Sequence, residues 1–239
     1  MKAALFERLQ AARSAKTPVA LVTTLGDGGQ ALVHQDGSGN DVDGDLPEPV
    51  VTEARRRLRD NASGVVEHDD ARYFIDCHNP PLRFIVVGAV HISQALAPMA
   101  AMAGYEVIVI DPRASFATAD RFPNVRLVDD WPDEAMEALA PDRRTAVVTL
   151  THDPKLDDPA LDVALKSDAF YIACLGSRRT HARRLERLRE LGFGDATLAR
   201  IHGPAGLSIG AVSPAEIALS ILAELTAVLH EAPAVAAAA

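Results

Sequence analysis

The sequence predicts an α/β protein, because two kinds of segment alternate along most of the chain. Short apolar runs such as FIVV, EVIVI and AVVTL recur in the C-terminal part, and segments of helical periodicity separate them. The runs are continuously apolar, which indicates strands that are covered on both faces. Strands that alternate with helices imply right-handed crossovers and a parallel sheet. This larger part is therefore expected to be a Rossmann-like domain with helices on both faces of its sheet.

Residues 1–79 predict a small α+β domain that precedes the parallel sheet. Apolar residues near the N-terminus recur at helical spacing, and the β-rich run PVALVTTL then ends in a Gly-Asp-Gly-Gly turn. The short run QALVH follows, which favours a hairpin. Residues 35–49 are rich in Gly, Asp and Pro and are expected to form an exposed loop. The sequence then predicts an amphipathic helix at TEARRRLRDN and short strands near residues 64–66 and 72–75.

The boundary between the two predicted domains is placed at Asn79-Pro80-Pro81, because proline removes backbone donors and restricts the residue before it. Residues 80–230 then form the Rossmann-like domain. Its expected strands and helices are, in order, LRFIVV, ISQALAPMAAMA, EVIVI, VRLV, DEAMEALA, TAVVTL, PALDVALK and FYIACL, followed by an Arg-rich helix, RRTHARRLERLREL, and a final amphipathic helix, PAEIALSILAELTAVL. Residues 231–239 are low in complexity and are expected to be a disordered tail.

The composition limits the classes of function. Asp and Glu total 33 against 24 Lys and Arg, a formal net charge of -9, which disfavours general nucleic-acid binding. The two cysteines exclude a disulfide framework and fit a reducing compartment. The N-terminus lacks the apolar core of a signal peptide, and no apolar run approaches the length that spans a bilayer. We therefore expect a cytoplasmic protein without membrane or nucleic-acid partners.

The first turn of the predicted parallel sheet, FIVVGAVHISQALAP, has the strand–turn–helix context of a dinucleotide fingerprint, but only one of its glycines. Gly88 occupies the first glycine position, whereas Val90 stands at the second. Asp111 ends the next strand at the usual offset for an acid that binds ribose hydroxyls, and Arg113 adds a cation for phosphate. Alternatively, Asp111 caps a loop and Arg113 is solvated. His91 either donates to a ligand phosphate or caps the helix.

A second polar segment follows the strand TAVVTL, where ligands of open α/β sheets bind. It contains His152, Asp153, Lys155, Asp157 and Asp158. One interpretation is a metal site, because the His and Asp side chains are competent ligands. Another is hydrogen bonding to a large polar cofactor, whose charge the lysine neutralises. The structural alternative is an Asx-rich turn before a helix that begins with proline and has Asp158 as its N-cap.

A third segment, after FYIACL, predicts an anion site at another strand end. Gly176 permits close approach, Ser177 and the following residues begin a helix, and Arg178, Arg179 and His181 add polar and cationic groups. The alternative is that the serine only caps this helix, while the helix presents a solvated arginine face. The arginines of that face are at positions 183, 184, 187 and 189.

The remaining features of the predicted domain have simpler interpretations. Cys174 lies on a strand and is expected to be a buried, inert thiol, since no basic side chain on that strand lowers its pKa. The Gly-rich segment 201–211 is either a lid over a ligand or an ordinary connection. Ser213 and Glu216 have the spacing of a capping box and predict the start of the last helix.

Five segments taken together resemble the XdhC/CoxI family of accessory proteins for molybdenum hydroxylases such as xanthine dehydrogenase and CO dehydrogenase. They are GAVHISQALAP, VIDPR, LTHDPKLDDPAL, FYIACLGSRRTHARRLERL and IGAVSPAEIALSILAE, and the likeness extends from Pro80 to about Leu229. The resemblance implies a protein that binds the molybdenum cofactor (molybdopterin), protects it and passes it in sulfurated form to an apo molybdenum hydroxylase. It also implies contact with a cysteine desulfurase. The strand-end turns would then hold the pterin phosphate or nucleotide.

The sequence departs from the family pattern in its N-terminal domain. Many members have a Gly-Gly-Cys segment there, but the corresponding stretch, ALVHQDGSGNDVDGDLPEP, contains no cysteine. This argues against a role that needs a thiol at that place, such as cysteine ligation of molybdenum or sulfur relay.

The sequence is compatible with three functions. The first is a molybdenum-cofactor binding and insertion chaperone without catalytic turnover, which we expect to be a homodimer. The second is an NAD(P)-dependent oxidoreductase on the same fold. It has a poor glycine fingerprint and no evident proton relay. The third is a regulatory module in which the helix from Arg178 to Arg189 docks an acidic partner.

Overall fold

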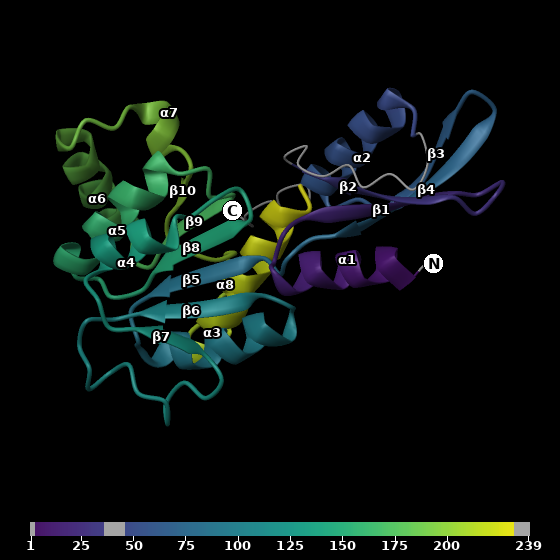
Figure 1. The fold of residues 1–239 in the computed structure, drawn as a ribbon. Helices are drawn as coiled ribbons and strands as arrows, with labels where there is room; N and C mark the ends of the chain where they lie inside the picture. Colours follow the sequence, from purple (N-terminus) through teal and green to yellow (C-terminus); the bar gives the residue numbers. More distant parts are fainter. Residues whose placement is uncertain (1–2, 36–45, 232–239) are drawn as a thin grey trace. The chain divides into compact units, whose positions relative to one another are not determined.

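The computed structural model describes residues 3–35 and 46–231. The chain divides into two compact units, Met1–Pro80 and Pro81–Ala239, and each has its own sheet (Figure 1). Most of the expected loop at 35–49 and nearly all of the expected tail at 231–239 lie outside the described residues. Within the described ranges, no helix is long and apolar enough to cross a membrane.

The N-terminal unit is a four-stranded antiparallel sheet in the order β2-β1-β4-β3. The predicted hairpin is confirmed, because β1 pairs antiparallel with β2 from Val19 opposite His34 to Thr23 opposite Gln30. The elements of this unit are α1 (Ala3–Ser14), β1 (Val19–Thr24), β2 (Gln30–His34), α2 (Glu48–Asp60), β3 (Gly64–His68) and β4 (Ala71–His78).

The two helices of this unit cover opposite faces of its sheet (Figure 1). On one face, α2 places Val50, Ala54 and Leu58 against the apolar side chains of the strands. On the other face, α1 places Leu5 and Leu9 in a smaller core. The alternation of apolar side chains along β1 supplies both cores, since successive strand residues point to opposite faces.

The C-terminal unit is a six-stranded sheet in the order β10-β9-β8-β5-β6-β7, and every pairing is parallel. The predicted Rossmann-like class is therefore confirmed. Its elements are β5 (Arg83–Val87), α3 (His91–Met102), β6 (Glu106–Ile110), β7 (Arg126–Val128), α4 (Pro132–Leu139), β8 (Thr145–Thr149), α5 (Pro154–Lys166), β9 (Tyr171–Cys174), α6 (Arg178–Glu190), α7 (Asp195–Leu198), β10 (Ile201–His202) and α8 (Pro214–Leu229).

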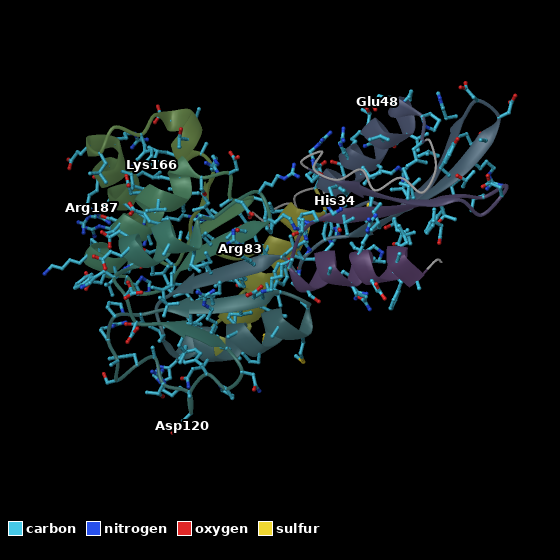
Figure 2. All side chains as sticks on the ribbon, viewed as in Figure 1. His34, Glu48, Arg83, Asp120, Lys166 and Arg187 are labelled. Carbon is cyan, nitrogen blue, oxygen red and sulfur yellow. The ribbon has the colours of Figure 1, made fainter. Side chains whose placement is uncertain are left out.

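Helices cover both faces of this sheet. One core contains buried side chains of α3 and α8, such as Leu96 and Ile221, and the other contains side chains of α4 and α5, such as Met136 and Leu161. Each strand contributes alternately to the two cores, and this explains the continuous apolar runs in the sequence. At the start of β5, Arg83 donates to the carbonyl oxygens of Leu139 and Ala140 at the end of α4 (Figure 2).

The strand order reverses beside β5. The chain runs outward from β5 through β6 to β7, returns to β8 on the other side of β5, and then runs outward through β9 to β10. The connections that follow β5 and β8 therefore leave the sheet in opposite directions. Ligands of open α/β sheets bind at such a switch point, beside the carboxyl ends of the strands.

Besides the short helix α7, which the sequence did not predict, two elements differ from the sequence prediction. The helix α5 begins at Pro154 with Asp153 as its N-cap, so the prediction of Asp158 as N-cap is wrong. Two Asp-Pro pairs compete in this segment, and the first one starts the helix. The second difference is β10, two residues within the segment 201–211 that pair parallel with β9. A strand of this length has no periodicity by which it could be predicted.

Candidate functional site

Turns from four strands of the C-terminal unit meet at the carboxyl edge of the sheet. Gly88 follows β5 with a φ of +111°, and a Cβ at this position would lie 2.6 Å from Cγ2 of Thr151, which follows β8. Thr151 in turn donates from Oγ1 to Oδ1 of Asp157 at 2.7 Å. Asp157 forms an ion pair with Arg184 of α6, the helix that follows β9. We call these residues, with Asp111, Arg113 and the turn 175–181, the strand-end cluster.

In the first turn of the cluster, after β5, backbone amides donate to side chains of the protein itself. The amide of Ala89 donates to Oδ2 of Asp111 at 2.8 Å, and the amide of Val90 donates to Oγ of Ser93 at 2.9 Å. The hydroxyl of Ser93 donates to the carbonyl oxygen of Gly88. In a dinucleotide fingerprint, this part of the backbone approaches the pyrophosphate. Here, both amides already donate to side chains of the protein, Asp111 and Ser93.

Asp111 is fully buried, and both of its oxygens accept hydrogen bonds from protein groups. Besides Ala89, the donors are Nε, Nη2 and the amide of Arg113, at 2.8, 2.7 and 3.0 Å. Burial by itself would raise the pKa of Asp111, but the hydrogen bonds from Arg113 and Ala89 outweigh it and lower the pKa. In this geometry Asp111 orients the first turn and Arg113. Its contact with a ribose hydroxyl stays a prediction.

Arg113 is held as an oriented, partly exposed cation. Its side chain is 39% exposed, and its guanidinium lies over the ring of Phe116 at 4.4 Å from the centroid. The hydrogen bond to Asp111 and the charges of Asp111, Asp153 and Asp157 raise the pKa of Arg113, so these carboxylates lie within its electrostatic reach. Nη1 has no hydrogen-bond partner among the described residues, and it is therefore open to a ligand.

The segment after β8 forms a capped turn. Thr151 accepts from the amide of Asp153 at 3.0 Å, and Asp153 accepts from the amide of Lys155 at the same distance. His152 adopts a positive φ of +62° and is exposed, as are Asp153 and Lys155. No group of three or more His, Cys, Asp and Glu side chains within the described ranges is placed to hold a metal ion. The metal alternative for this segment therefore has no support in the structure.

Asp157 and Arg184 form a buried ion pair, with 1% and 2% of their side chains exposed and 3.5 Å between Oδ2 and Nη2. Burial raises the pKa of Asp157, and the hydrogen bond from Thr151 and the charge of Arg184 only partly offset it. Arg184 also donates from Nη2 to the carbonyl oxygen of Leu175 at 3.0 Å. A guanidinium thus lies beneath the turn that joins β9 to α6.

The prediction of a solvated arginine face on α6 is therefore wrong for two of its four members. Arg184 is buried against Asp157, and Arg187 is half-buried in a bidentate pair with Asp158, at 2.5 and 2.9 Å (Figure 2). These two arginines fall on the side of α6 that packs against α5, where the carboxylates lie. Arg183 and Arg189 are exposed as predicted.

The start of α6 presents open backbone amides. Ser177 is the N-cap, as predicted, and its Oγ accepts from the amide of Thr180 at 3.1 Å. The amides of Arg178 and Arg179, in the first helical turn, have no acceptor among the described residues. His181 is half-buried, and burial and the charge of Arg184 lower its pKa. Anion binding by these groups stays a prediction.

Other predicted site residues lie at the edge of this cluster. The side chains of four of them make no hydrogen bond or ion pair within the described part of the chain, and all four are exposed: His91, Lys155, Arg178 and Arg179. Cys174 is fully buried, as predicted, and burial raises the pKa of its thiol to about 12. The thiol is therefore protonated at neutral pH and unsuited to bind a metal.

Sequence reasoning missed Ser93, Thr151 and Arg184. Ser93 lies three residues after the N-cap Val90, but valine has no side-chain oxygen, so the capping-box pattern does not reveal it. Arg184 shares a helical stripe with Leu188, which is also buried. An arginine on the apolar stripe of a helix is a signal for burial that the sequence contained.

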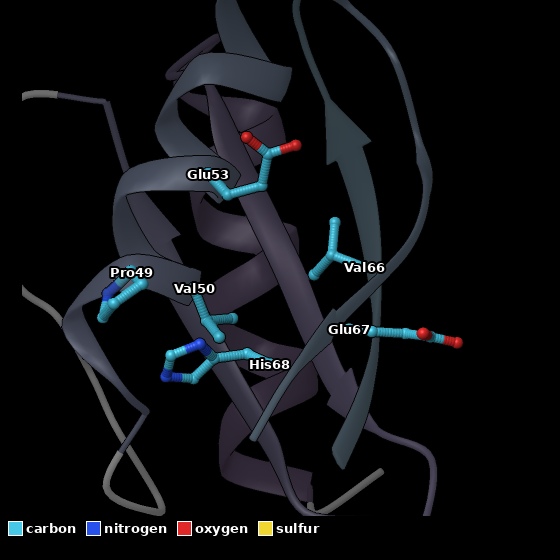
Figure 3. Close-up of a pocket in the computed structure, with 6 residues that line it drawn as sticks. All are labelled: Pro49, Val50, Glu53, Val66, Glu67 and His68. Atoms are coloured by element: carbon cyan, nitrogen blue, oxygen red, sulfur yellow. The ribbon is translucent and has the colours of Figure 1, made fainter. Parts of the chain in front are cut away.

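A pocket of the N-terminal unit contains none of the predicted site residues. It has a volume of about 250 Å³ and lies between α2 and β3 (Figure 3). Glu53 lines it, and hydrogen bonds from Arg56 and Arg57 lower the pKa of Glu53 to about 2. The carboxylate is thus already paired. The other lining residues are Pro49, Val50, Val66, Glu67 and His68.

The doubly wound parallel sheet, with cationic and amide groups at its switch point, defines a Rossmann-type domain. Residues 84–225 match the family model described as the XdhC Rossmann domain. This match covers more than half of the chain, so the chain belongs to the XdhC family.

Three curated relatives share about a third of their aligned residues with this chain. A protein of Escherichia coli named uncharacterized protein YqeB is 34% identical over 164 residues, 67% of this chain and 30% of the relative. The molybdenum cofactor insertion chaperone PaoD of Escherichia coli is 33% identical over 153 residues, 64% of this chain and 42% of PaoD. A protein of Bacillus subtilis named as a probable subunit of xanthine dehydrogenase is 33% identical over 153 residues, 64% of this chain and 44% of the relative. This chain spans less than half the length of each relative.

A solved structure confirms the fold. The crystal structure of a protein described as a xanthine dehydrogenase from Bacillus halodurans superposes with a TM-score of 0.73 at 24% identity. The superposition covers 94% of this chain and 66% of the other. At this level of identity, the likeness concerns the fold alone.

Proposed function

We propose that this chain binds the molybdenum cofactor in the strand-end cluster and passes it to an apo molybdenum hydroxylase. The observation that supports the proposal most is the set of open donors at one sheet edge, in a chain of the XdhC family. The amides of Arg178 and Arg179 and Nη1 of Arg113 have no acceptor within the ranges that the structure describes, so they could bind an anion. The name of the relative PaoD as a cofactor insertion chaperone supports the same cargo.

The residues present suit the organic part of the cofactor. Backbone amides at a helix start and planar guanidinium groups bind phosphate. The described residues offer no cluster of metal ligands, and Cys174 is buried as a neutral thiol. The chain would hold the pterin by its phosphate and leave the metal end to other groups. A site of this kind binds and releases its cargo, and it needs no catalytic residue.

Retention of the cofactor tests the proposal. Cofactor released from a molybdoenzyme is mixed with the purified chain, and the mixture is separated by anaerobic gel filtration. We expect molybdenum and pterin fluorescence to elute with the protein at a ratio of about one. The loaded chain should then activate apo-hydroxylase faster than free cofactor does. Elution of the cofactor with the small molecules alone contradicts the proposal.

The geometry disfavours an NAD(P)-dependent oxidoreductase. The amides of Ala89 and Val90 donate to Asp111 and Ser93, and the carboxylate that would bind ribose pairs with Arg113. A dinucleotide would have to replace these bonds. Quenching of reduced nicotinamide fluorescence at micromolar concentrations would favour the oxidoreductase instead.

The partners of the chain are part of the proposal. We propose that an apo molybdenum hydroxylase receives the cofactor, that a cysteine desulfurase supplies the sulfur, and that the chain acts as a homodimer in the cytoplasm. The docking module with an acidic partner has less support, because Arg184 and Arg187 pair with carboxylates of the chain itself. Charge reversal at Arg178 and Arg179, followed by a pull-down with the apo-hydroxylase and a ligand assay, separates docking from ligand binding.

A further inference from the structure

Near the start of α6 lie four buried side-chain atoms that have no hydrogen-bond partner in the described part of the chain. They are Oδ2 of Asp157, Nδ1 of His181, and Nε and Nη1 of Arg184. Nearly all buried polar groups in proteins are hydrogen-bonded, and leaving one unpaired costs about 1–3 kcal/mol. The two unpaired donors of Arg184 therefore point to an acceptor outside the polypeptide, whereas Oδ2 of Asp157 is itself an acceptor and already lies in the ion pair with Arg184.

Arg184 directs its charge toward the turn that precedes α6. It lies on the second turn of the helix, and helical side chains extend toward the N-terminal end. Nη2 donates to the carbonyl oxygen of Leu175 and forms the ion pair with Asp157, at 3.0 and 3.5 Å. One carboxylate at the longer distance does not saturate a guanidinium with five donor hydrogens. Nε and Nη1 are left for another acceptor.

Gly176 lies above the buried Nη1 of Arg184. The residue is partly exposed, its φ is +145°, and a Cβ built on it would lie 3.9 Å from Nη1 of Arg184. An oxygen bound at this turn would have to come closer to Nη1 than the Cβ position does in order to accept a hydrogen bond. The same Cβ would lie 3.2 Å from Thr180, so a side chain at residue 176 would crowd the helix start.

The helix start supplies donors from the other side. Ser177 caps the amide of Thr180, and the amides of Arg178 and Arg179 stay open. The helix has 13 residues, long enough for a developed dipole at its N-terminus. Two amides and a guanidinium around one glycine match the oxygens of a tetrahedral anion.

We propose that Gly176, the amides of Arg178 and Arg179, and Arg184 form a subsite for one phosphate-monoester group. The inference deepens the proposed function, because the phosphate of the pterin is the group that would lie there. Inorganic phosphate shares this chemistry and is the simplest probe. Arg184 binds the anion from beneath the turn, and Asp157 holds the guanidinium in place when the subsite is empty.

Titration of the full chain with inorganic phosphate tests the subsite. Calorimetry compares the wild type with Arg184→Met and with a matched control, Arg183→Met, an exposed arginine of the same helix. Loss of a charge-assisted hydrogen bond predicts at least about tenfold weaker phosphate binding in Arg184→Met. The control is expected to change the affinity less than about twofold, since exposed charges are screened. Equal loss in both variants overturns the subsite.

A second variant controls for loss of binding that results from misfolding. Arg184→Met leaves Asp157 buried without its cation, which is strongly destabilising in proteins. The double variant Asp157→Asn, Arg184→Met removes both charges and is expected to keep the wild-type circular dichroism and to bind phosphate as weakly as the single variant. Wild-type affinity in the folded double variant overturns the proposal.

Nitrogen-15 spectra of the wild type locate the ligand directly. Saturating phosphate is expected to shift the Nε–Hε signal of Arg184 and the amide signals of Arg178 and Arg179. No shift of the Arg184 signal at saturation overturns the subsite.

The titration also separates this inference from the proposed function. Phosphate binding through Arg184 without cofactor retention leaves the subsite standing and contradicts the chaperone. Wild-type cofactor retention by the folded double variant supports the chaperone and overturns the subsite.

Discussion

At the scale of single residues, the strand-end cluster depends on side chains that meet across different turns. Gly88 makes room for Thr151, and Thr151 connects Gly88 to Asp157. Asp157 then holds Arg184 below the start of α6. Each residue contacts the next one, so we expect a change at the first turn to affect the proposed anion subsite.

Gly88→Ala tests this connection. The substitution adds a Cβ 2.6 Å from Cγ2 of Thr151 at a φ of +111°. We expect the free energy of unfolding to fall by about 2–4 kcal/mol, because backbone strain and overpacking add. Chemical denaturation measures the change.

Two variants serve as controls for this substitution. Gly104→Ala also has a positive φ, +91°, but an added Cβ meets nothing within 4 Å, so it reports the strain alone. Thr151→Ser removes the crowded methyl group and keeps the hydroxyl that binds Asp157. The double variant Gly88→Ala, Thr151→Ser should therefore recover part of the loss. A double variant no more stable than Gly88→Ala would show that the contact with Thr151 is not the cause.

At the scale of elements, one carboxylate joins the last helix to the edge of the sheet. Glu224 of α8 accepts from the hydroxyl of Tyr171 in β9 at 2.7 Å and from the amide of Gly206 at 2.8 Å. Nδ1 of His202 in β10 lies 3.3 Å from the same carboxylate. Burial alone would raise the pKa of Glu224, but the hydrogen bonds from His202, Tyr171 and Gly206 outweigh it and lower the pKa. The connection between β10 and α8 is held by this network.

Glu224→Gln is expected to make the free energy of unfolding less dependent on pH. A carboxyl group with a lowered pKa in the folded state contributes stability above its unfolded pKa, near 4.5, and loses it as the pH falls through the folded value. The wild type should therefore exceed the variant in free energy of unfolding at about pH 6, and the difference should shrink toward about pH 3. Denaturation at several pH values measures it.

Glu137→Gln, at an exposed position of α4, provides the matched control for Glu224→Gln and should show little difference from the wild type at any pH. A difference between the wild type and Glu224→Gln that stays constant with pH contradicts the assignment.

At the scale of the whole molecule, the chain consists of two units with separate cores. The C-terminal unit has an apolar core on each face of its sheet, and the N-terminal unit has its own two smaller cores. The XdhC match lies entirely within the C-terminal unit, as does the strand-end cluster. The ligand binding proposed above would therefore belong to the C-terminal unit.

Residues 81–231 are expected to fold on their own, because a unit of this size buries a sufficient core. The fragment should unfold in one cooperative transition and bind phosphate with an affinity within about threefold of the full chain, a difference of less than about 1 kcal/mol. Circular dichroism and calorimetry measure both properties. A fragment without a cooperative transition would show that the C-terminal unit needs the rest of the chain.

The sequence alone determined the class of the fold and the identity of nearly all its elements. Continuous apolar runs reported burial on both faces of the sheet, and local signals such as Ser177 and the pair Ser213 and Glu216 located helix starts. These features depend on neighbours that are near in sequence, so a single chain contains them. The position of each strand-end turn followed from the same pattern, because parallel strands end at one edge.

Only the tertiary structure decided which polar groups of those turns are occupied and which are open. Asp111 binds the first turn and Arg113, and Arg184 is buried against Asp157. Among the described residues, the first two amides of α6 have no acceptor. The order of the strands and the rotation of α6 against α5 bring these partners together. Local sequence patterns encode neither the strand order nor the rotation of α6, because both result from packing between segments that are far apart along the chain.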